Sequence, residues 1–355
     1  MTAEHTTVSI DDLQAFCTEA MIAAGMRPED AKLSAEVLAA NDSWGIHTHG
    51  TKQLRGLMDN FRRGRMDTAA EAEVVKDGPS FAVFDGHRSM PVVSSVGAMR
   101  TAIEKARQTG IACTVVYNSG HNAGAGYYAN MAAEEGMFGM AMTNVDIVMA
   151  VTGSKGPVLG TNPIAYASPA GNESPVMLDI ATSVVAASKA FACRQLGQPM
   201  PEPWLLDRDG VPTTDPSNYP EEGAIVPMAG YKGYGIALMI EILTGLLVGA
   251  PYASHLNSWV NDTDDPVNQS HTFIAIDINQ FTPIESFKEN MDALIGDIKN
   301  APKARGVDRI FLPGEMEWGR REKAEENGIP LPEDVILKLQ GLAEDVGVEK
   351  PAFLQ

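Results

Sequence analysis

Short apolar runs alternate with helical patterns through most of this chain, and this alternation constrains its fold more than any other feature. Between residues 70 and 315, β-forming runs are followed by segments with helical spacing, which is typical of a mixed α/β fold. The predicted strands are 81–84, 111–117, 137–143, 163–167, 176–180, 273–278 and 309–312. The predicted helices are 93–108, 123–135, 184–196, 233–248 and 284–299.

Both ends of the chain are predicted to be helical. A capping pair at Ser9 and Asp12 starts one helix, Pro28 starts a second, and a third covers 53–63. Two more helices follow Glu315.

Two long connections, 197–230 and 251–271, interrupt the α/β region and are rich in proline and glycine. Loops of this length inside a compact domain usually have a functional or interfacial role. We therefore expect one or both of them to lie at a site or an interface.

Charge and cysteine content exclude several classes of protein. The 355 residues carry a formal net charge of -19, which argues against nonspecific nucleic-acid binding because phosphate binding needs basic patches. The three cysteines, Cys17, Cys113 and Cys193, are far apart and show no metal-binding spacing, so we expect free thiols in a reducing cytoplasm.

Neither a targeting segment nor a membrane span is predicted. The first five residues show no basic region followed by an apolar one, so we expect no signal peptide. The longest apolar helix, near residues 236–248, carries Glu241 and is expected to be too short to cross a bilayer.

The segment 118–129 carries the most specific chemistry. It places His121 at the end of the apolar strand 111–117 and begins a glycine-rich helix directly afterwards. An imidazole titrates near neutral pH, and the N–H groups at a helix N-terminus bind anions. This arrangement suits acid–base chemistry beside an anionic ligand.

The same segment also fits a dinucleotide-binding fingerprint. Gly124, Gly126 and Ala129 have the required spacing, and Asp146 follows about 20 residues later, where a ribose-binding acid is expected. The fit is poor because the glycines fall inside the predicted helix instead of a tight turn. Small residues for close helix packing are the alternative interpretation.

A second cluster spans residues 45–54 and contains His47 and His49. Two histidines two residues apart suggest a metal, but no acidic residue or cysteine lies at useful local spacing. His49, between Thr48 and Gly50, fits better as a proton donor or hydrogen-bond partner to an oxygen. A purely structural histidine is the remaining alternative.

Two further positions follow strands or open helices. Asp146 lies after the strand 137–143 and is expected either to orient a histidine or substrate hydroxyl, or to cap a turn. Lys232 opens a glycine-rich helix, where a cation opposes the helix dipole unless an anion neutralises it. A phosphate or carboxylate is the natural anion, and a solvated lysine is the alternative.

Taken together and in this order, these segments resemble the malate/L-lactate dehydrogenase family of NAD(P)-dependent oxidoreductases. The resemblance covers nearly the whole chain. Its strongest matches are Asn118-Ser119-Gly120-His121, Leu159-Gly160-Thr161-Asn162-Pro163, Asp179-Ile180-Ala181-Thr182-Ser183, the stretch from Asp207 to Pro216, and Lys232-Gly233-Tyr234-Gly235.

The resemblance implies a mixed α+β fold that is not a Rossmann fold. It implies a helical domain made from residues 1–69 and 316–355 beside a cofactor- and substrate-binding α/β domain made from residues 70–315. It also implies a homodimer whose active sites lie near the subunit interface.

Site residues are carried over position by position. The resemblance implies that His121 is the proton acceptor, that His49 belongs to the family's Ser-His-Gly motif with Thr48 in place of serine, and that Asp146 is an active-site aspartate. It implies cofactor contacts, with NAD or NADP, at Asp179, Ile180, Ala181, Lys232, Pro313, Gly314 and Glu315.

Two departures affect the substrate side. Many relatives have an arginine at the position of Gln53, where it is expected to bind the substrate carboxylate, and some have a tyrosine where this chain has Leu57. Glutamine cannot reproduce the bidentate, charge-assisted contact of arginine. Thr48, Lys52 and Gln53 are therefore expected to bind the substrate, with Lys52 or Arg55 compensating, unless the substrate lacks this contact.

The sequence therefore predicts hydride transfer between a nicotinamide and C2 of a small 2-hydroxy or 2-oxo acid. Reduction of a cyclic imino acid is the first alternative. A metal-dependent lyase or hydrolase that uses His47, His49 and His121, and a non-catalytic ligand-binding protein, are the others. No metal, nucleic-acid or membrane partner is expected.

Overall fold

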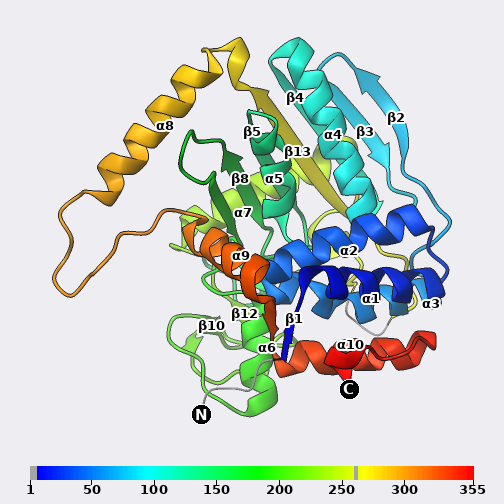
Figure 1. Cartoon of the computed structure of the whole chain (residues 1–355). Helices are drawn as coiled ribbons and strands as arrows, with labels where there is room; N and C mark the ends of the chain where they lie inside the picture. Colours follow the sequence, from blue (N-terminus) through cyan, green and yellow to red (C-terminus); the bar gives the residue numbers. More distant parts are fainter. Residues whose placement is uncertain (1–5, 260–262) are drawn as a thin grey trace.

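The computed structural model describes residues 6–259 and 263–355. A seven-stranded sheet lies at the centre of the molecule, with strand order β2-β3-β4-β13-β5-β8-β9 (Figure 1). In chain order its strands are Glu73–Gly78 (β2), Phe81–Asp85 (β3), Ile111–Ser119 (β4), Met137–Thr143 (β5), Ile164–Ser168 (β8), Val176–Ile180 (β9) and Gln269–Asp277 (β13).

The directions of these strands exclude a Rossmann sheet, whose neighbouring strands are mostly parallel. Among the described strands of the large sheet, β3 and β4 are parallel, and every other neighbouring pair is antiparallel. The expectation of a mixed, non-Rossmann α/β fold is confirmed.

The glycines that mimic a dinucleotide fingerprint have a packing role instead. A Cβ atom at Gly124 would lie 2.1 Å from Asn41 Oδ1, and one at Gly126 would lie 3.1 Å from Asp179 Oδ2. A larger residue at Gly124 would have to displace the Asn41 side chain, and one at Gly126 would be tightly packed against Asp179.

Strand β13 joins the two halves of the sheet. It runs antiparallel between β4 and β5, although it follows them by more than 120 residues in the sequence. Its pairing with β4 shifts between Gln269 and His271, which marks a β-bulge or a similar irregularity. Its interior residues Phe273 and Ala275 are fully buried.

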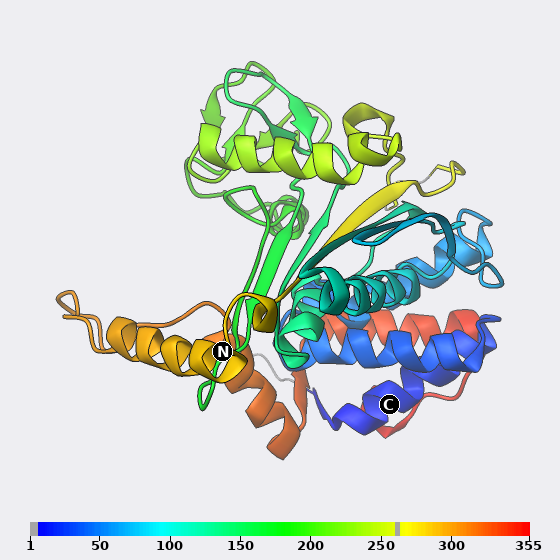
Figure 2. The same cartoon turned by 90° about the horizontal axis from the view of Figure 1, so that it is seen from above.

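Helices cover both faces of the large sheet. Helices α4 (Pro91–Thr109) and α5 (Ala125–Glu134) pack on one face, and α7 (Tyr231–Thr244) packs against β5 and β13 (Figure 2). Helix α5 approaches β5 closely because both present small residues: Ala129 and Ala132 are fully buried, and Gly139 of β5 faces them.

The two ends of the chain meet in a helical layer beside α4 (Figure 2). Its helices are α1 (Ile10–Ala23), α2 (Pro28–Ser43), α3 (Leu54–Arg62), α9 (Glu315–Asn327) and α10 (Glu333–Val346). Strand β1 (Thr6–Val8) pairs antiparallel with β14 (Ile329–Leu331), and α10 packs on α1 and α3. These contacts agree with a helical part built from both ends, and its boundaries at residues 69 and 315 stay a prediction.

A second, five-stranded sheet forms a separate lobe on the α7 side (Figure 2). Its order is β11-β10-β12-β6-β7, with strands Met149–Ala150 (β6), Pro157–Leu159 (β7), Leu205–Leu206 (β10), Pro212–Thr213 (β11) and Ala224–Ile225 (β12). Helix α6 (Ala187–Leu196) accompanies it, and Met200, Tyr219 and Ile225 belong to its own small apolar core. The predicted loop 197–230 therefore contains three short strands.

Helix α8 (Ile284–Lys299) projects from the body of the molecule (Figures 1 and 2). Ile295 is the one residue of this helix that is fully buried, and Leu294 is 52% exposed. The remaining elements are short 3-10 helices at His47–His49 (η1), Thr51–Gln53 (η2), Leu246–Val248 (η3), Ala253–His255 (η4), Ile278–Gln280 (η5) and Ala352–Leu354 (η6).

Six of the seven predicted strands are confirmed, and the strand predicted at 309–312 is wrong. That segment has no β-ladder partner, and Phe311 in it is 53% exposed. Strand β2 was missed because five of its six residues are exposed and three of them are charged, at the edge of the sheet. The helix predicted from residue 123 begins at Ala125 instead, because Ala123 has a φ of +65°.

Two predictions lie partly outside the described residues. The expected absence of a signal peptide rests on residues 1–5, and the expected loop 251–271 includes residues 260–262. The described part of that loop contains η4 and the first residues of β13.

The expected length of the apolar helix near residues 236–248 is wrong. With η3 it runs from Tyr231 to Val248, and these 18 residues, with a mean hydropathy of 1.4, are long and apolar enough to cross a membrane by length and composition alone. A core helix of a soluble protein passes the same test. Glu241, in the middle of the segment, is only 2% exposed and faces the interior.

The contact between α5 and β5 gives a first prediction. A Cβ atom at Gly139 would lie 2.2 Å from the backbone oxygen of Ala129, so Gly139→Ala must move the helix off the strand. Urea denaturation should show a loss of about 1–3 kcal/mol, or more, in the free energy of unfolding. The matched control is Gly97→Ala in α4, where a Cβ meets nothing within 4 Å and should stabilise by about 0.5–1 kcal/mol. Equal effects of the two substitutions would contradict this packing.

Candidate active site

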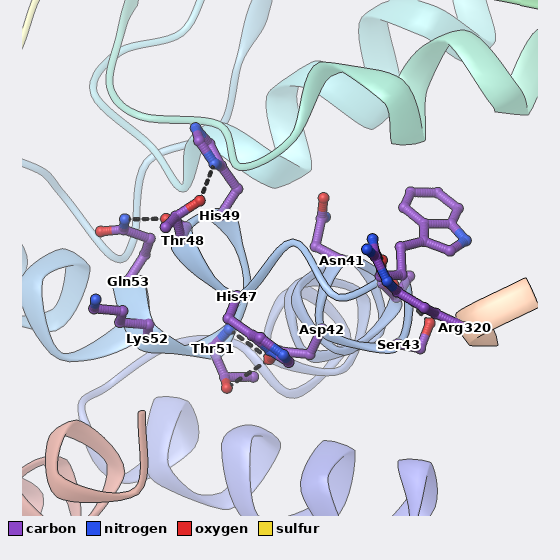
Figure 3. A network of polar contacts seen from close by, with 12 residues as sticks. Asn41, Asp42, Ser43, His47, Thr48, His49, Thr51, Lys52, Gln53 and Arg320 are labelled. Atoms are coloured by element: carbon purple, nitrogen blue, oxygen red, sulfur yellow. Dashed lines mark hydrogen bonds and ion pairs between the residues drawn. The ribbon is translucent and has the colours of Figure 1, made fainter. Parts of the chain in front are cut away.

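A buried carboxylate holds the turn that carries His49. Asp42, at the end of α2, is 1% exposed and accepts three hydrogen bonds. The donors are His47 Nδ1 at 2.8 Å, the backbone N–H of Thr51 at 2.8 Å and the Thr51 hydroxyl at 2.7 Å (Figure 3). These bonds satisfy a carboxylate that would otherwise be costly to bury.

The same carboxylate explains Gly50. A Cβ atom at this position would lie 2.3 Å from Asp42 Oδ1, so no other residue fits without displacing the carboxylate. His47 therefore has a structural role, since its Nδ1 is bound to Asp42. Among residues 6–259 and 263–355, no group of three or more histidine, cysteine or acidic side chains is arranged to hold a metal.

The two predicted catalytic histidines meet. The rings of His49 and His121 are stacked, with centroids 5.3 Å apart and an interplanar angle of 28°. Burial lowers the pKa of His49 from 6.5 to about 4. Burial also lowers the pKa of His121 well below its usual value, and the neighbouring His49 adds to this shift. Both imidazoles are therefore neutral at physiological pH.

A hydrogen bond to His121 indicates which of its two ring nitrogens carries the proton. Its Nδ1 accepts the backbone N–H of Ala123 at 3.3 Å. A neutral imidazole carries one proton, so this contact places the proton on Nε2. His49 Nδ1 is occupied by the Thr48 hydroxyl at 2.9 Å (Figure 3).

Asp146 is joined to the same site. It accepts a hydrogen bond from the Ser258 hydroxyl and another, at 3.2 Å, from Gln269 Nε2. Burial raises its pKa, although these two hydrogen bonds act in the opposite direction. These contacts differ from the alternative prediction, in which Asp146 caps a turn.

Trp259 is a site residue that the sequence did not identify. Its ring lies 4.4 Å from that of His121, at an interplanar angle of 32°. Asn60 Nδ2 donates to its carbonyl at 3.1 Å, and the buried Arg65 donates to the carbonyls of Ser258 and, at 2.9 Å, Asp265. The long loop 251–271 was the available signal, since it is one of two connections of which at least one was expected to lie at a site or an interface.

Of the residues predicted to bind the substrate, Gln53 lies beside His49, whereas Lys52 is bound to α10. Gln53 Nε2 donates to the Thr48 carbonyl beside His49 (Figure 3). Lys52 Nζ forms an ion pair with Asp334 of α10 at 2.5 Å, and Arg55 forms one with Asp345 of the same helix at 2.7 Å. Both cations are thus bound by α10 and neither is seen to compensate for the missing arginine.

Leu57 stands where some relatives have a tyrosine. Leu57 is fully buried in the core of the helical layer, so it contributes packing and no polar contact to the site. The substrate-binding roles of Thr48, Lys52 and Gln53 stay predictions.

Glu241 organises the strand ends around the site. This buried carboxylate of α7 accepts from Asn162 Nδ2 at 2.7 Å, from Asn144 Nδ2 at 3.4 Å and from the backbone N–H of Ala253 at 2.8 Å. Asn162 Oδ1 in turn accepts the N–H of Val145 at 3.1 Å. These bonds place the turn after β5, which carries Asp146.

The predicted cofactor residues begin at the N-terminus of α5. Asp179 Oδ2, at the end of β9, accepts the N–H of Gly126 at 2.7 Å, and burial raises the pKa of its carboxyl to about 6. Its Oδ1 has no hydrogen-bond donor within the part of the chain that the structure describes, which leaves an acceptor for a hydroxyl group. This helix terminus lies only a few residues beyond His121.

Lys232 comes close to the same strand end. The N–H of Met228 donates to the carbonyl of Thr182 at 2.9 Å, and a Cβ at Gly233 would lie 2.7 Å from that carbonyl oxygen. The first turn of α7 is therefore packed against the segment that follows Ile180 and Ala181. Lys232 is exposed there and forms no ion pair with a described residue.

The turn Pro313–Glu315 lies against the start of β9. The N–H of Met177 donates to the carbonyl of Pro313 at 3.1 Å. Gly314 has a φ of +87°, and a Cβ there would lie 2.9 Å from the Met177 carbonyl oxygen. Glu315 forms ion pairs with Arg309 and, at 3.5 Å, Lys299. All the predicted cofactor residues thus belong to one region around β9.

Comparison with known proteins agrees with this geometry. The sequence profile of the malate/L-lactate dehydrogenase family matches residues 8–340. The chain belongs to the malate/L-lactate dehydrogenase family. The family is one of NAD(P)-dependent dehydrogenases of hydroxy and oxo acids, so this part of the sequence prediction is confirmed.

Several relatives are similar over their whole length. A malate dehydrogenase of Pyrococcus abyssi is 38% identical over 96% of this chain and 94% of its own. The crystal structure of malate dehydrogenase from Entamoeba histolytica has a TM-score of 0.92 at 29% identity, covering 98% of this chain and 99% of the other.

Two further relatives are named for different cofactors. A ureidoglycolate dehydrogenase (NAD(+)) of Escherichia coli is 29% identical over 92% of this chain and 93% of its own. A (2R)-3-sulfolactate dehydrogenase (NADP(+)) of Chromohalobacter salexigens is 30% identical over 95% of this chain and 98% of its own.

The burial of the imidazoles predicts their titration. Imidazole resonances followed by NMR should show His49 and His271 neutral down to about pH 5, because burial lowers their pKa values to about 4 and about 3. Unfolded histidines bind a proton near pH 6.5, so their contribution to stability is complete above that pH and is lost as the pH falls. Asp179 acts in the opposite sense, since its raised pKa favours the folded state at low pH. A midpoint near 6.5 for His49 or His271 would contradict the burial of these rings.

Proposed function

We propose that this protein transfers a hydride between a nicotinamide cofactor and C2 of a small 2-hydroxy or 2-oxo acid, with His121 as the proton donor and acceptor. The observation that carries the proposal is the stacked pair of His49 and His121, a few residues before the α5 terminus bound by Asp179. Malate-, lactate- and ureidoglycolate-type acids form the substrate class, and a cyclic imino acid is the alternative.

The residues around β9 fit a nicotinamide dinucleotide. The free Oδ1 of Asp179 suits a ribose hydroxyl, and Lys232 at the first turn of α7 suits a phosphate. We propose that Asp179, Ile180, Ala181, Lys232 and the turn Pro313–Glu315 hold NAD or NADP. When bound, the cofactor supplies or accepts the hydride at C2 of the substrate.

The chain supplies the proton and the orientation. During reduction, the imidazolium form of His121 gives one proton to the oxygen on C2 and is left as the neutral ring; during oxidation, the neutral ring takes that proton back. We assign the orientation of the substrate to His49, whose Nδ1 is occupied by Thr48 and whose ring is stacked on that of His121. Asp146 acts through Ser258 and the adjacent Trp259, which contacts the ring of His121.

The neutral state of the histidines supports this assignment. The neutral imidazole of His121 can accept the hydroxyl proton of a 2-hydroxy acid, and the imidazolium that results donates this proton in the reverse direction. The surrounding desolvation strengthens each hydrogen bond to the substrate oxygen.

Substitution of His121 tests the proton transfer. His121→Ala should lower kcat roughly 100- to 10,000-fold, because general acid–base catalysis is lost. The dissociation constant of the reduced cofactor, measured by fluorescence, should stay within about twofold, because the Ala side chain leaves β9 and α7 unchanged. His87→Ala, at an exposed position, is the matched control. Near-normal turnover of His121→Ala would reject the proposed role.

The substrate class is tested by an assay of 2-oxo acids, 2-hydroxy acids and cyclic imino acids with both cofactors, followed by the absorbance of the reduced nicotinamide. Turnover of a 2-oxo or 2-hydroxy acid supports the proposal, and turnover of a cyclic imino acid alone supports the alternative. Activity that needs a metal and no nicotinamide would favour a lyase or hydrolase. Failure to bind either cofactor would favour a non-catalytic protein.

We also propose that the protein is a homodimer whose interface includes α7. The outer face of α7 and η3 is apolar, with Tyr231 68%, Ile242 44%, Leu246 47% and Leu247 57% exposed. A patch of this kind is unusual on a monomer and is typical of a subunit interface. The free thiols Cys17, Cys113 and Cys193 support a reducing, cytoplasmic location.

Charge on this face should separate the subunits. The double substitution Ile242→Glu and Leu246→Glu places two carboxylates on the proposed interface and should convert a dimer into a species of the 38.0 kDa chain mass in sedimentation velocity. Leu337→Glu is the control, because Leu337 is 58% exposed on α10 outside this face. A monomeric native protein, or a dimer unaffected by the double substitution, would contradict the proposal.

A further inference from the structure

We propose that His271 is a positioning residue that holds His121 in its reactive orientation by fixing both ends of the segment 119–122. The inference rests on the proposed function, in which His121 moves the proton. His271 lies on β13, about 150 residues from His121 in the sequence, and its side chain is fully buried. Its imidazole forms two side-chain hydrogen bonds, to Ser119 and to Thr143.

The first bond fixes the start of the segment. His271 Nε2 lies 3.0 Å from the Ser119 hydroxyl, which is itself 1% exposed. In the ladder, His271 pairs with Val116, and Gln269 pairs with Ser119, so the register shifts between the two. This irregularity lets the imidazole reach a residue three positions along β4 from its ladder partner.

The second bond fixes the end of the segment. His271 Nδ1 lies 2.9 Å from Thr143 Oγ1, and the Thr143 hydroxyl donates to Asn122 Oδ1 at 3.4 Å. Because Thr143 has one hydroxyl proton and gives it to Asn122, Nδ1 of His271 must be the donor toward Thr143. Nε2 of the neutral ring is then the acceptor for Ser119, so each bond has a defined direction.

The backbone around His121 needs such support. Asn118 and Ala123, which flank the segment on either side, have φ values of +50° and +65°. Non-glycine residues in this region are strained and persist where the surroundings hold them. The N–H of Ala123 is also the donor to His121 Nδ1, so relaxation at this residue would alter the orientation and tautomer of the catalytic ring.

Other contacts of Asn122 leave His271 as the link between the two ends. Asn122 Nδ2 donates to the Ser95 hydroxyl at 3.0 Å, and the backbone carbonyl of Asn122 accepts from the Tyr128 hydroxyl at 2.5 Å. Neither contact reaches Ser119. The imidazole of His271 is therefore the group that couples the two sides of His121 through described hydrogen bonds.

The test uses His271→Asn, which keeps one polar group, and His271→Leu, which removes both hydrogen bonds at similar volume. We expect kcat to fall roughly 10- to 100-fold in His271→Leu, because a small misplacement of the proton donor is costly. We expect a smaller fall in His271→Asn and a cofactor dissociation constant that changes less than twofold in both. His255→Leu, at an exposed position on η4, is the control and should leave kcat unchanged.

A double-substitution cycle separates positioning from general stability. In the His121→Ala background, His271→Leu should cause no further loss of kcat, because it acts through His121. An equal loss in both backgrounds, or an unchanged kcat in His271→Leu, would overturn the proposal. If His271→Leu fails to fold, Ser119→Ala, which removes one of the two bonds, serves in its place with the same expectation.

A readout independent of activity distinguishes this proposal from the proposed function. The NMR resonances of the His121 ring should shift in His271→Leu and not in His255→Leu. Normal turnover of His121→Ala would reject the proton-transfer role, while a shifted His121 resonance would still support the positioning. An unshifted His121 resonance would overturn the positioning itself.

Discussion

The insertion of β13 between β4 and β5 is the constraint on which the candidate site depends. His121 follows the end of β4 and Asp146 follows the end of β5, and β13 is bonded to both strands. The first residues of β13 carry the supporting contacts: Gln269 reaches Asp146, and His271 reaches Ser119 and Thr143. One strand, late in the sequence, thus fixes the geometry of two earlier segments.

Desolvation gives this site its chemistry. His49 and His121 are kept neutral by burial, and burial favours the protonated form of Asp146. Neutral imidazoles with defined hydrogen-bond partners cost less to bury than unpaired charges. The buried carboxylates Asp42 and Glu241 differ, since each is bonded to several donors and serves to hold the turns.

Local patterns were sufficient to predict much of this structure. The strand, glycine-rich turn and helix around His121 lie within 25 residues, so their sequence alone identified them. His49 and Lys232 were predicted from local sequence, and Asp179, Ile180, Ala181 and the turn Pro313–Glu315 from the family resemblance. The structure places Asp179 and this turn along β9. The strand predicted at 309–312 failed because an apolar pattern cannot show whether a ladder partner exists.

The supporting residues could not be predicted, because their role depends on contacts distant in the sequence. Gln269, Ser270, His271 and Thr272 are at most 1% exposed, yet their polarity excluded them from the predicted strand. Among them, Gln269 Nε2 donates to Asp146, His271 contacts Ser119 and Thr143, and the Thr272 hydroxyl donates to the carbonyl of Leu243 in α7. Trp259 likewise lies in a polar loop, and only the fold places its ring on His121.

The most direct measurement of the central claim is a crystal structure of the protein with reduced cofactor and oxamate, an unreactive analogue of a 2-oxo acid. The account predicts that His121 Nε2 lies within hydrogen-bond distance of the analogue's C2 oxygen, on the side opposite to Ala123, with the nicotinamide carbon facing C2. An analogue bound away from His121, or a His121 ring turned into the protein interior, would contradict it.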